Sequence, residues 1–403
     1  MNKKTLQDLD LDQLRGSTVL VRADLNVPLA SGVITDDQRI RASLPTLRTL
    51  TGAGARVVVL SHLGRPKGKT DPACSLAPVA ARLGELLEAP VRFIPEVTGS
   101  AAAEDVASLG AGEVGVLENT RFTGGETSGD PSLAASWAAL GDIFVNDAFG
   151  TAHRAHASTA GLATAMRSRG RESVAGMLLA RELEFLEDAL LDPARPFVAI
   201  VGGAKISSKI GVISSLLPRV DHLLIGGAMA NTFFRALGLS TGNSLIEEDS
   251  IETARALLSE GGERLVLPVD CVVAPRIASD VAARAVERTD IQSGDMVLDV
   301  GPKTRQRFAA MVGLARTVVW NGPMGVFEVD PFAEGTVDIA HSVARACDAG
   351  AIGILGGGDS AAAAERAGVG DRLTHVSTGG GASLELLAGK TLPGVDALTD
   401  RSL

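Results

Sequence analysis

The sequence contains few residues of the kinds that mark whole classes of protein. Among its 403 residues there is no tyrosine, and aromatic residues make up only 3%, which argues against a surface on which nucleic-acid bases stack. The net charge of −10 also argues against a nucleic-acid partner, because such binding needs a basic face. Three widely spaced cysteines, Cys74, Cys271 and Cys347, form no CxxC pair, so we expect free thiols in a reducing compartment.

Long apolar stretches are also missing. No run of about 18 apolar residues is present to span a membrane, and the polar N-terminus lacks the apolar core of a secretory signal. The motifs HExxH, GxSxG and HRDxxxxN do not occur, which argues against zincin, α/β-hydrolase and protein-kinase chemistry. We therefore expect a cytoplasmic protein with no membrane partner.

Short apolar runs do occur, and they alternate with stretches of helical period. The runs predict strands at residues 18–21, 57–60, 91–94, 114–117 and 143–145, and again at 197–201, 222–225, 264–267, 271–274, 297–300, 317–320 and 351–355. Helices are predicted at residues 37–50, 76–87, 177–191 and 361–366. This alternation indicates an α/β fold with two doubly wound parallel-sheet, Rossmann-like domains. The mid-chain helix could join the domains or belong to one core.

Polar and cationic residues directly follow the predicted strands of the first half. They are Asp24, Asn26, His62, Arg65, Arg121, His153 and Arg154. Because the carboxyl ends of parallel strands share one edge of a sheet, these side chains should converge there. A single arginine in such a place is usually a solvated surface residue, but several together favour an anion pocket.

Glycines take the corresponding places in the second half. Gly356, Gly357 and Gly358 end an apolar run and precede Asp359, Ser360 and a helical stretch. This pattern is typical of a phosphate site at a helix N-terminus, with Asp359 holding a metal ion and Ser360 donating to phosphate. A tight turn capped by Asp359 or Ser360 is the alternative.

Two lysines follow another pair of glycines. Lys205 and Lys209 lie four residues apart behind Gly202 and Gly203. We expect them one helical turn apart on one face, where two like charges repel unless an anion lies between them.

The two edges together fit a phosphoryl transfer between a small acidic molecule and a nucleotide. Such a transfer depends on positioning and charge stabilisation, and an ionised carboxylate acceptor needs no general base. The segment 64–70 is similar to a Walker A loop, but only three residues separate its glycines where the motif needs four. His153 and His156 have no third ligand nearby, which argues against a transition-metal site.

Six segments, in order along the chain, resemble the motifs of the phosphoglycerate kinase family. They are residues 22–28 (RADLNVP), 61–66 (SHLGRP), 150–156 (GTAHRAH), 202–205 (GGAK), 320–328 (WNGPMGVFE) and 356–360 (GGGDS). The resemblance implies a kinase of glycolysis and gluconeogenesis, an ATP:3-phosphoglycerate phosphotransferase that uses Mg²⁺. It would carry phosphate between 1,3-bisphosphoglycerate and MgADP by in-line transfer when two domains close about a cleft.

The same resemblance implies a role for individual residues. It assigns 3-phosphoglycerate to Asp24, Asn26, Arg39, His62, Arg65, Arg121 and Arg154. It assigns the nucleotide to Lys205, Lys209, Asn321, Glu328, Gly357, Gly358, Asp359 and Ser360, with Glu328 on the ribose and Asp359 on Mg²⁺. Catalysis would fall to Arg39, Lys205, Gly357 and Gly358. Many members carry glycine where Val297 stands, so the adenine pocket should be slightly narrower.

The resemblance also implies a monomer and a domain layout. Residues 1–176 would bind 3-phosphoglycerate, 177–192 would form the interdomain helix, 193–388 would bind the nucleotide, and 389–403 would return to the first domain. Two other classes stay open on the residues alone. The strand-glycine-helix junctions suggest an NAD-dependent oxidoreductase, although no GxGxxG is correctly placed, and the fold could also serve an inactive phosphate or nucleotide sensor.

Overall fold

The computed structural model describes residues 2–401 and divides into two compact units. Unit 1 comprises Met1–Glu184 and Thr391–Leu403, and unit 2 comprises Phe185–Lys390. The C-terminal segment joins unit 1 through backbone contacts near the chain start: the Lys4 amide donates to the Thr399 carbonyl at 2.8 Å. The boundary between the units falls inside helix α7 (Met177–Leu191).

Unit 1 is built on a six-stranded sheet in which every neighbouring pair is parallel. Its order is β5 (Val91–Ile94), β6 (Val114–Leu117), β4 (Arg56–Leu60), β1 (Thr18–Arg22), β7 (Ile143–Asn146) and β8 (Ser173–Ala175). All five residues of β1 are buried, as expected for a strand covered on both faces. A small hairpin, β2 (Leu29–Ala30) and β3 (Val33–Ile34), follows β1.

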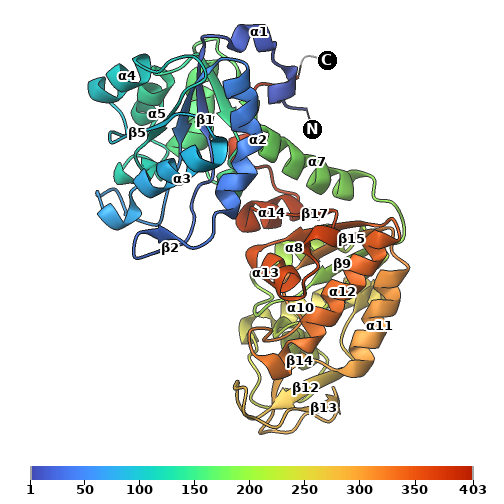
Figure 1. Cartoon of the computed structure of the whole chain (residues 1–403). Helices are drawn as coiled ribbons and strands as arrows, with labels where there is room; N and C mark the ends of the chain where they lie inside the picture. The colour runs from blue at the N-terminus through green and yellow to red at the C-terminus, as the bar shows by residue number, and fades with distance from the viewer. Residues whose placement is uncertain (1, 402–403) are drawn as a thin grey trace. The chain divides into compact units, whose positions relative to one another are not determined.

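Helices cover this sheet on its two faces. They are α1 (Leu11–Leu14), α2 (Gln38–Gly52), α3 (Ala77–Leu87), α4 (Ser100–Ala107), α5 (Pro131–Ala138), α6 (Leu162–Arg167) and, from the C-terminal segment, α15 (Pro393–Asp396). Leu47 of α2 and Leu83 of α3 join Val19 and Val57 in one buried cluster, so these two helices pack on the same face (Figure 1). The chain leaves β1 toward β4 and later returns to β7 on the opposite side of β1. Ligands of open α/β sheets bind at such a reversal.

Unit 2 repeats this architecture. Its parallel sheet has the order β11 (Leu265–Val266), β10 (His222–Ile225), β9 (Phe197–Val201), β15 (Thr317–Asn321), β16 (Ile352–Gly356) and β17 (His375–Val376). The strand order reverses between β9 and β15, so the loops after these strands lie at the equivalent place. The expected α/β class with two parallel-sheet domains is confirmed.

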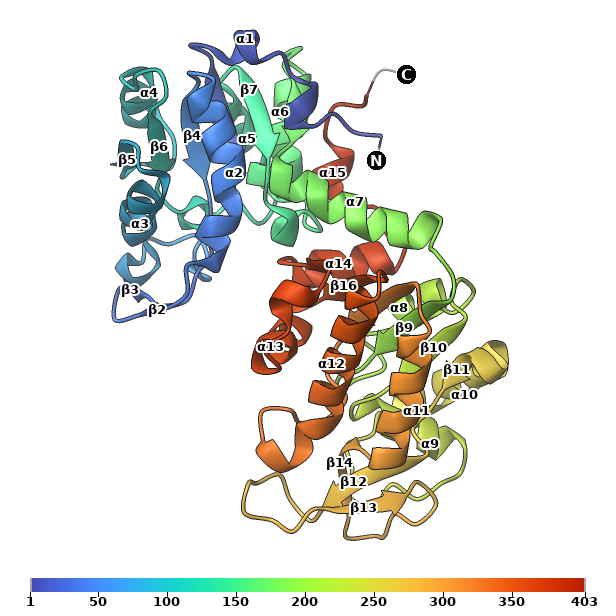
Figure 2. The same cartoon turned by 45° about the vertical axis from the view of Figure 1, so that its right-hand side comes forward.

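Seven helices of unit 2 pack around its sheet. They are α8 (Ile210–Leu216), α9 (Met229–Ala236), α10 (Ile251–Gly261), α11 (Pro302–Gly313), α12 (Glu334–Asp348), α13 (Gly358–Arg366) and α14 (Gly380–Leu387). Phe308 of α11, Ile339 of α12 and Ala363 of α13 share a buried cluster with Trp320 of β15. Figure 2 shows α11 and α12 lying side by side.

One part of unit 2 differs from the prediction. Residues 271–274 and 297–300 were expected to continue the parallel sheet, but they form β12 (Asp270–Ala274) and β14 (Met296–Val300) of a separate antiparallel sheet. The unpredicted β13 (Arg284–Glu287) pairs with β12 on its other side. Apolar runs predict that a strand forms but not its direction, and the connection between β12 and β14 lacks the helix that usually makes a parallel crossover.

Within residues 2–401, none of the helices combines the length and the apolar character needed to cross a membrane.

Candidate active site

The residues predicted after the strands of unit 1 do come together at the carboxyl edge of its sheet. We call Asp24, Asn26, Arg39, His62, Arg65, Arg121 and Arg154 the unit 1 rim. Arg39 lies in the first turn of α2, and its guanidinium donates to the Asp24 carboxylate at 2.6 Å. Asp37 at the start of the same helix accepts from Arg82 of α3 at 2.7 Å. The start of α2 is therefore held from two sides.

Side-chain hydrogen bonds also fix the loops that carry this rim. The Asn26 side chain accepts from the Gly64 amide at 2.9 Å, and Arg121 donates to the Gly64 carbonyl at 2.8 Å. Asn119 is wholly buried; it accepts from the Arg121 amide and donates to the Leu63 carbonyl. These bonds tie the loops after β1, β4 and β6 to one another, so the rim is preorganised.

Several cationic side chains crowd together at the unit 1 rim. Burial, together with the charges of Arg22, Arg121, Arg39 and His156, holds the pKa of His62 well below its ordinary value of 6.5. Burial also lowers the pKa of His156 to about 4, with Arg121, Arg22 and Arg154 acting in the same direction against Glu126. Arg65 and Arg154 are exposed, and Arg154 donates to His153 Nε2 at 3.1 Å. An anion would relieve this crowding of like charges.

Three residues beneath the rim were not predicted. Arg22 and Glu126 are wholly buried, as is Ser158 between them. The sequence does carry one signal for Arg22, because it is a charged residue that directly ends the run TVLV and is still part of the buried strand. Glu126 and Ser158 lie in stretches without any pattern, so nothing local could have found them.

The corresponding edge of unit 2 consists largely of backbone. We call Lys205, Lys209, Asn321, Glu328, Gly357, Gly358, Asp359 and Ser360 the unit 2 rim. Behind it, the Gly203 amide donates to the Pro323 carbonyl at 3.0 Å, and the Gly227 amide donates to the Met324 carbonyl at 2.8 Å. The loops after β9, β10 and β15 thus touch one another directly.

Several glycines behind the rim are required by this contact. A Cβ added to Gly202 would lie 2.1 Å from the Pro323 carbonyl oxygen, and one added to Gly227 would lie 2.5 Å from the Gly203 backbone. Gly227 also has a φ of +68°, which favours glycine. These glycines allow close packing between loops, so they are not by themselves a sign of phosphate binding.

The expectation that Lys205 and Lys209 share a helical face is wrong. Helix α8 begins at Ile210, Lys209 occupies its N-cap position, and Lys205 lies in the preceding loop. The helix starts late because Ser207 is held elsewhere: its amide and hydroxyl donate to the Glu247 carboxylate at 3.0 and 2.6 Å. Short polar side chains with such partners compete with helix formation.

Lys209 instead points to the last residue of β15. Its ammonium donates to the Asn321 side-chain oxygen, while the Asn321 amide donates to the Gly356 carbonyl at 2.5 Å. Burial lowers the pKa of Lys209, and the charge of Asp359 opposes this shift. Lys209, Asn321 and Asp359 are therefore neighbours at the end of β15 and β16.

Helix α13 starts three residues earlier than predicted, at Gly358, with Gly357 as its N-cap at a φ of +101°. Neither Asp359 nor Ser360 is the N-cap. The Ser360 hydroxyl is buried; it donates to the Gly356 carbonyl at 3.0 Å and accepts from the Gly322 amide at 2.7 Å. Because the Ser360 hydroxyl donates its only proton within the loop, the backbone amide of Ser360 is the donor left for a ligand.

The start of α13 has free space above it. A Cβ added to Gly358 meets nothing within 4 Å, and the side chains of Asp359, Lys205 and Glu328 are exposed. The first N–H groups of a helix lack intrahelical acceptors and attract anions. The unit 2 rim thus combines unpaired backbone donors, two lysines and two exposed carboxylates.

Asp359 fits the metal that the resemblance implies. Mg²⁺ is usually held by one or two carboxylates together with substrate phosphates. Among residues 2–401, no group of three or more His, Cys, Asp or Glu side chains could hold a metal by itself. An exposed carboxylate beside the open start of α13 suits a nucleotide-bound Mg²⁺.

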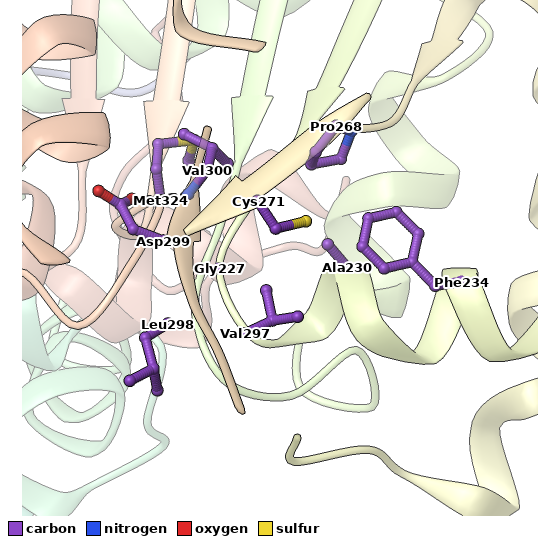
Figure 3. Close-up of a pocket in the computed structure, with 10 residues that line it drawn as sticks. All are labelled: Gly227, Ala230, Phe234, Pro268, Cys271, Val297, Leu298, Asp299, Val300 and Met324. Atoms are coloured by element: carbon purple, nitrogen blue, oxygen red, sulfur yellow. Dashed lines mark hydrogen bonds between the residues drawn. The ribbon is translucent and has the colours of Figure 1, made fainter. Parts of the chain in front are cut away.

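Val297 lies in a narrow apolar pocket of unit 2. Its side chain lines the pocket with Phe234, Cys271 and Met324 (Figure 3). The free volume is about 10 Å³, close to what one water needs. An aromatic ring would fit there only if the walls moved apart.

Comparison with known proteins identifies the family. The family model described as phosphoglycerate kinase matches residues 6–390. The chain belongs to the phosphoglycerate kinase family. It is 56% identical to the phosphoglycerate kinase of Chloroflexus aurantiacus, over 99% of this chain and 100% of that one, and 50% identical to that of Lactobacillus delbrueckii subsp. bulgaricus, over 100% of both.

Solved structures of phosphoglycerate kinases support the same conclusion. The enzyme from Coxiella burnetii superposes with a TM-score of 0.88 at 41% identity, and that from Pyrococcus horikoshii with a TM-score of 0.83 at 32% identity. Each match covers 98% of both chains. The membership of the phosphoglycerate kinase family that the sequence motifs predicted is therefore confirmed.

Proposed function

We propose that the two rims carry out the family's reaction between them. The chain is a phosphoglycerate kinase, an enzyme of glycolysis that transfers a phosphoryl group between 1,3-bisphosphoglycerate and ADP, giving 3-phosphoglycerate and ATP. In the proposal, the unit 1 rim binds the phosphoglycerate and the unit 2 rim binds the nucleotide. The observation that carries it is the contrast between a preorganised cluster of guanidiniums on one sheet and exposed helix-start amides on the other.

The unit 1 rim suits a small molecule with a carboxylate and a phosphate. Arginine forks onto such groups with two parallel hydrogen bonds. Arg121 and Arg154 both depress the pKa of His156, and Arg39 acts on that of His62, so the cations lie close together. Asp24 and Asn26 can accept from a substrate hydroxyl, although each already holds one protein donor.

The unit 2 rim suits a chain of phosphates. We propose that the amides at the start of α13 bind phosphate oxygens, that Lys205 and Lys209 balance their charge, and that Glu328 accepts from the ribose. Asn321 acts indirectly, by holding Lys209 beside the Gly356 carbonyl. Mg²⁺ held by Asp359 would neutralise charge on the nucleotide phosphates.

Catalysis then rests on charge stabilisation. Arg39 and Lys205 steady the negative charge that spreads over the transferring group, and Gly357 and Gly358 leave space and amide donors for it. The acceptor carboxylate is ionised at neutral pH, so no side chain needs to take a proton. The two domains must close during transfer, because water would otherwise compete for the phosphoryl group.

The proposal includes a cytoplasmic monomer. Three cysteines without disulfide partners among the described residues are compatible with a reducing compartment. The monomeric state is a prediction from the family resemblance, and sedimentation or light scattering of the pure protein tests it.

A coupled assay tests the activity itself. The pure chain is mixed with 1,3-bisphosphoglycerate and MgADP, and ATP formation is followed by its consumption in a second enzymatic step. We expect ATP to form only when both substrates are present. If no ATP forms from protein that is folded by circular dichroism, the proposal fails.

A further inference from the structure

Arg22 is a wholly buried guanidinium at the carboxyl end of β1, directly beneath the unit 1 rim. Its three nitrogens all have partners: Nε donates to the Ser158 hydroxyl at 2.8 Å, one terminal nitrogen donates to the Ala23 carbonyl, and the other contacts His62 Nδ1 at 3.0 Å. The side chain is thus fixed by three hydrogen bonds below the rim.

The contact with His62 has only one possible direction. Arginine has no acceptor and does not lose its proton in proteins. Arg22 must therefore donate, and His62 Nδ1 must accept with its lone pair. A neutral imidazole carries one proton, so that proton lies on Nε2. Within the described residues, Nε2 makes no hydrogen bond, and it is the nitrogen left for a ligand.

The surrounding charges act in the same direction. Arg22, Arg121, Arg39 and His156 all disfavour a second proton on the imidazole, and burial does so most strongly, so the pKa of His62 is well below 6.5. The carboxylates in this neighbourhood, Asp24 and Glu126, act on Arg22 and Arg121, and Asp24 is already paired with Arg39.

A chain of buried hydrogen bonds through Ser158 and Glu126 holds Arg22 in place. The Ser158 hydroxyl that accepts from Arg22 donates its own proton to the Glu126 carboxylate at 2.5 Å, and the Ser158 amide donates to the second Glu126 oxygen at 2.9 Å. Glu126 is wholly buried and supplies the negative charge that Arg22 requires. Residues from three separate stretches of unit 1 therefore set the orientation of one guanidinium.

We propose that Arg22 is a positioning residue that holds His62 as the neutral imidazole with its proton on Nε2, so that the ring offers the substrate a hydrogen-bond donor and no charge. His62 then differs from the arginines around it. They attract the anion over a distance, whereas His62 provides one directed N–H for an oxygen of the bound acid. For its effect on turnover the inference rests on the proposed function, but the tautomer exists in the free protein.

Nitrogen NMR of the histidine rings tests the tautomer directly. The full chain is labelled with ¹⁵N in its six histidines, and the His62 signals are assigned as those lost in His62→Gln. A protonated and an unprotonated ring nitrogen have widely separated shifts. We expect Nε2 protonated and Nδ1 unprotonated throughout pH 6–8. A proton on Nδ1, or a doubly protonated ring at pH 7, would overturn the proposal, and this measurement needs no Arg22 variant to fold.

Variants then separate positioning from mere support of the fold. Arg22→Met removes the donor to Nδ1, so His62 should show both tautomers and titrate at a higher pH. Arg22→Lys keeps a cationic donor and should restore the Nε2–H form at least in part. Arg171→Met is the matched control, because Arg171 also donates to buried backbone, at Ala138 and Gly141 before β7. It should leave the His62 signals unchanged; a change equal to that of Arg22→Met would contradict the proposal.

The kinetic consequence is a pH-dependent KM. The ratio of the KM values for 3-phosphoglycerate of Arg22→Met and wild type should change as the pH falls from 8 to 6, because the variant protonates His62 at a higher pH than wild type does. The titration of the substrate cancels in this ratio. If the NMR result is as expected but the KM ratio stays constant, the tautomer is correct and the role of His62 in substrate binding is wrong. If wild type forms no ATP, the proposed function is wrong instead.

Discussion

The two sheets end in rims built by opposite means. In unit 1 the rim is made of side chains, and buried side chains beneath it, such as Arg22 and Asn119, hold them in place. In unit 2 the rim is made largely of backbone, and it is shaped by loops that touch through glycines such as Gly202 and Gly227. Directed side chains can distinguish one small acid from another, whereas backbone amides bind any phosphate that fits. The difference matches the two substrates of the proposed reaction.

The largest effect is expected from removing a charge at the unit 1 rim. Arg39→Ala should lower kcat by about 10²–10³, the usual cost of losing a group that stabilises transition-state charge, and should change KM for 3-phosphoglycerate far less. Arg48→Ala on the same helix is the control, because Arg48 is exposed and donates to the Leu86 carbonyl. Steady-state kinetics measure both. A change in KM alone would show that Arg39 only binds substrate.

This contrast also explains what the sequence could predict. His62 and Arg121 lie in the loops that follow apolar runs, so their position at the sheet edge could be predicted from the sequence. The hydrogen bonds beneath the rim could not be predicted, because Ser158 and Glu126 are far from Arg22 in the sequence and are brought near it only by the fold.

In unit 2 the unpredicted features depend on contacts between distant segments. Helix α8 begins at Ile210 because Glu247, forty residues after Ser207, accepts from it. Likewise, no local pattern shows that position 202 requires glycine. A Cβ added there would lie only 2.1 Å from the carbonyl oxygen of Pro323, which is far away in the sequence. The roles of individual rim residues stay predictions until they are measured.

The next largest effect concerns the loops of unit 2. Gly227→Ala should lower the free energy of unfolding by about 3 kcal/mol, because its Cβ would clash with fixed backbone and its φ is positive. Gly238→Ala is the matched control: its φ is +78°, but a Cβ there meets nothing within 4 Å. Urea unfolding should show a loss of only about 1 kcal/mol for this control. Equal losses would mean that loop contact is unimportant.

A smaller effect is expected from a buried carboxylate of unit 1. Burial raises the pKa of Asp147 to about 6 from 3.8, although the Leu178 and Leu179 amides at the start of α7 donate to it. Because the folded state resists ionisation, stability due to Asp147 falls as the pH rises from about 4 to 6 and is constant above. Relative to Asp147→Asn, wild type should lose about 1–2 kcal/mol between pH 5 and 7. Urea unfolding across this range measures the difference, and a difference independent of pH would contradict the prediction.

The smallest effect is expected at the start of α13. Gly358→Ala should leave stability within about 1 kcal/mol of wild type, since the added Cβ meets no protein atom. If phosphate occupies that space, KM for MgATP should rise about tenfold, which corresponds to about 1.4 kcal/mol. Unchanged nucleotide kinetics in this variant would place the phosphates elsewhere.

Separate binding of the two ligands tests the division of labour most directly. Calorimetric titrations with 3-phosphoglycerate alone and with MgADP alone are compared for wild type, Arg154→Ala and Gly358→Ala. Both substituted residues are exposed. The account predicts that Arg154→Ala weakens only the phosphoglycerate and Gly358→Ala weakens only the nucleotide. If either variant weakened both ligands equally, the assignment of one substrate to each rim would be wrong.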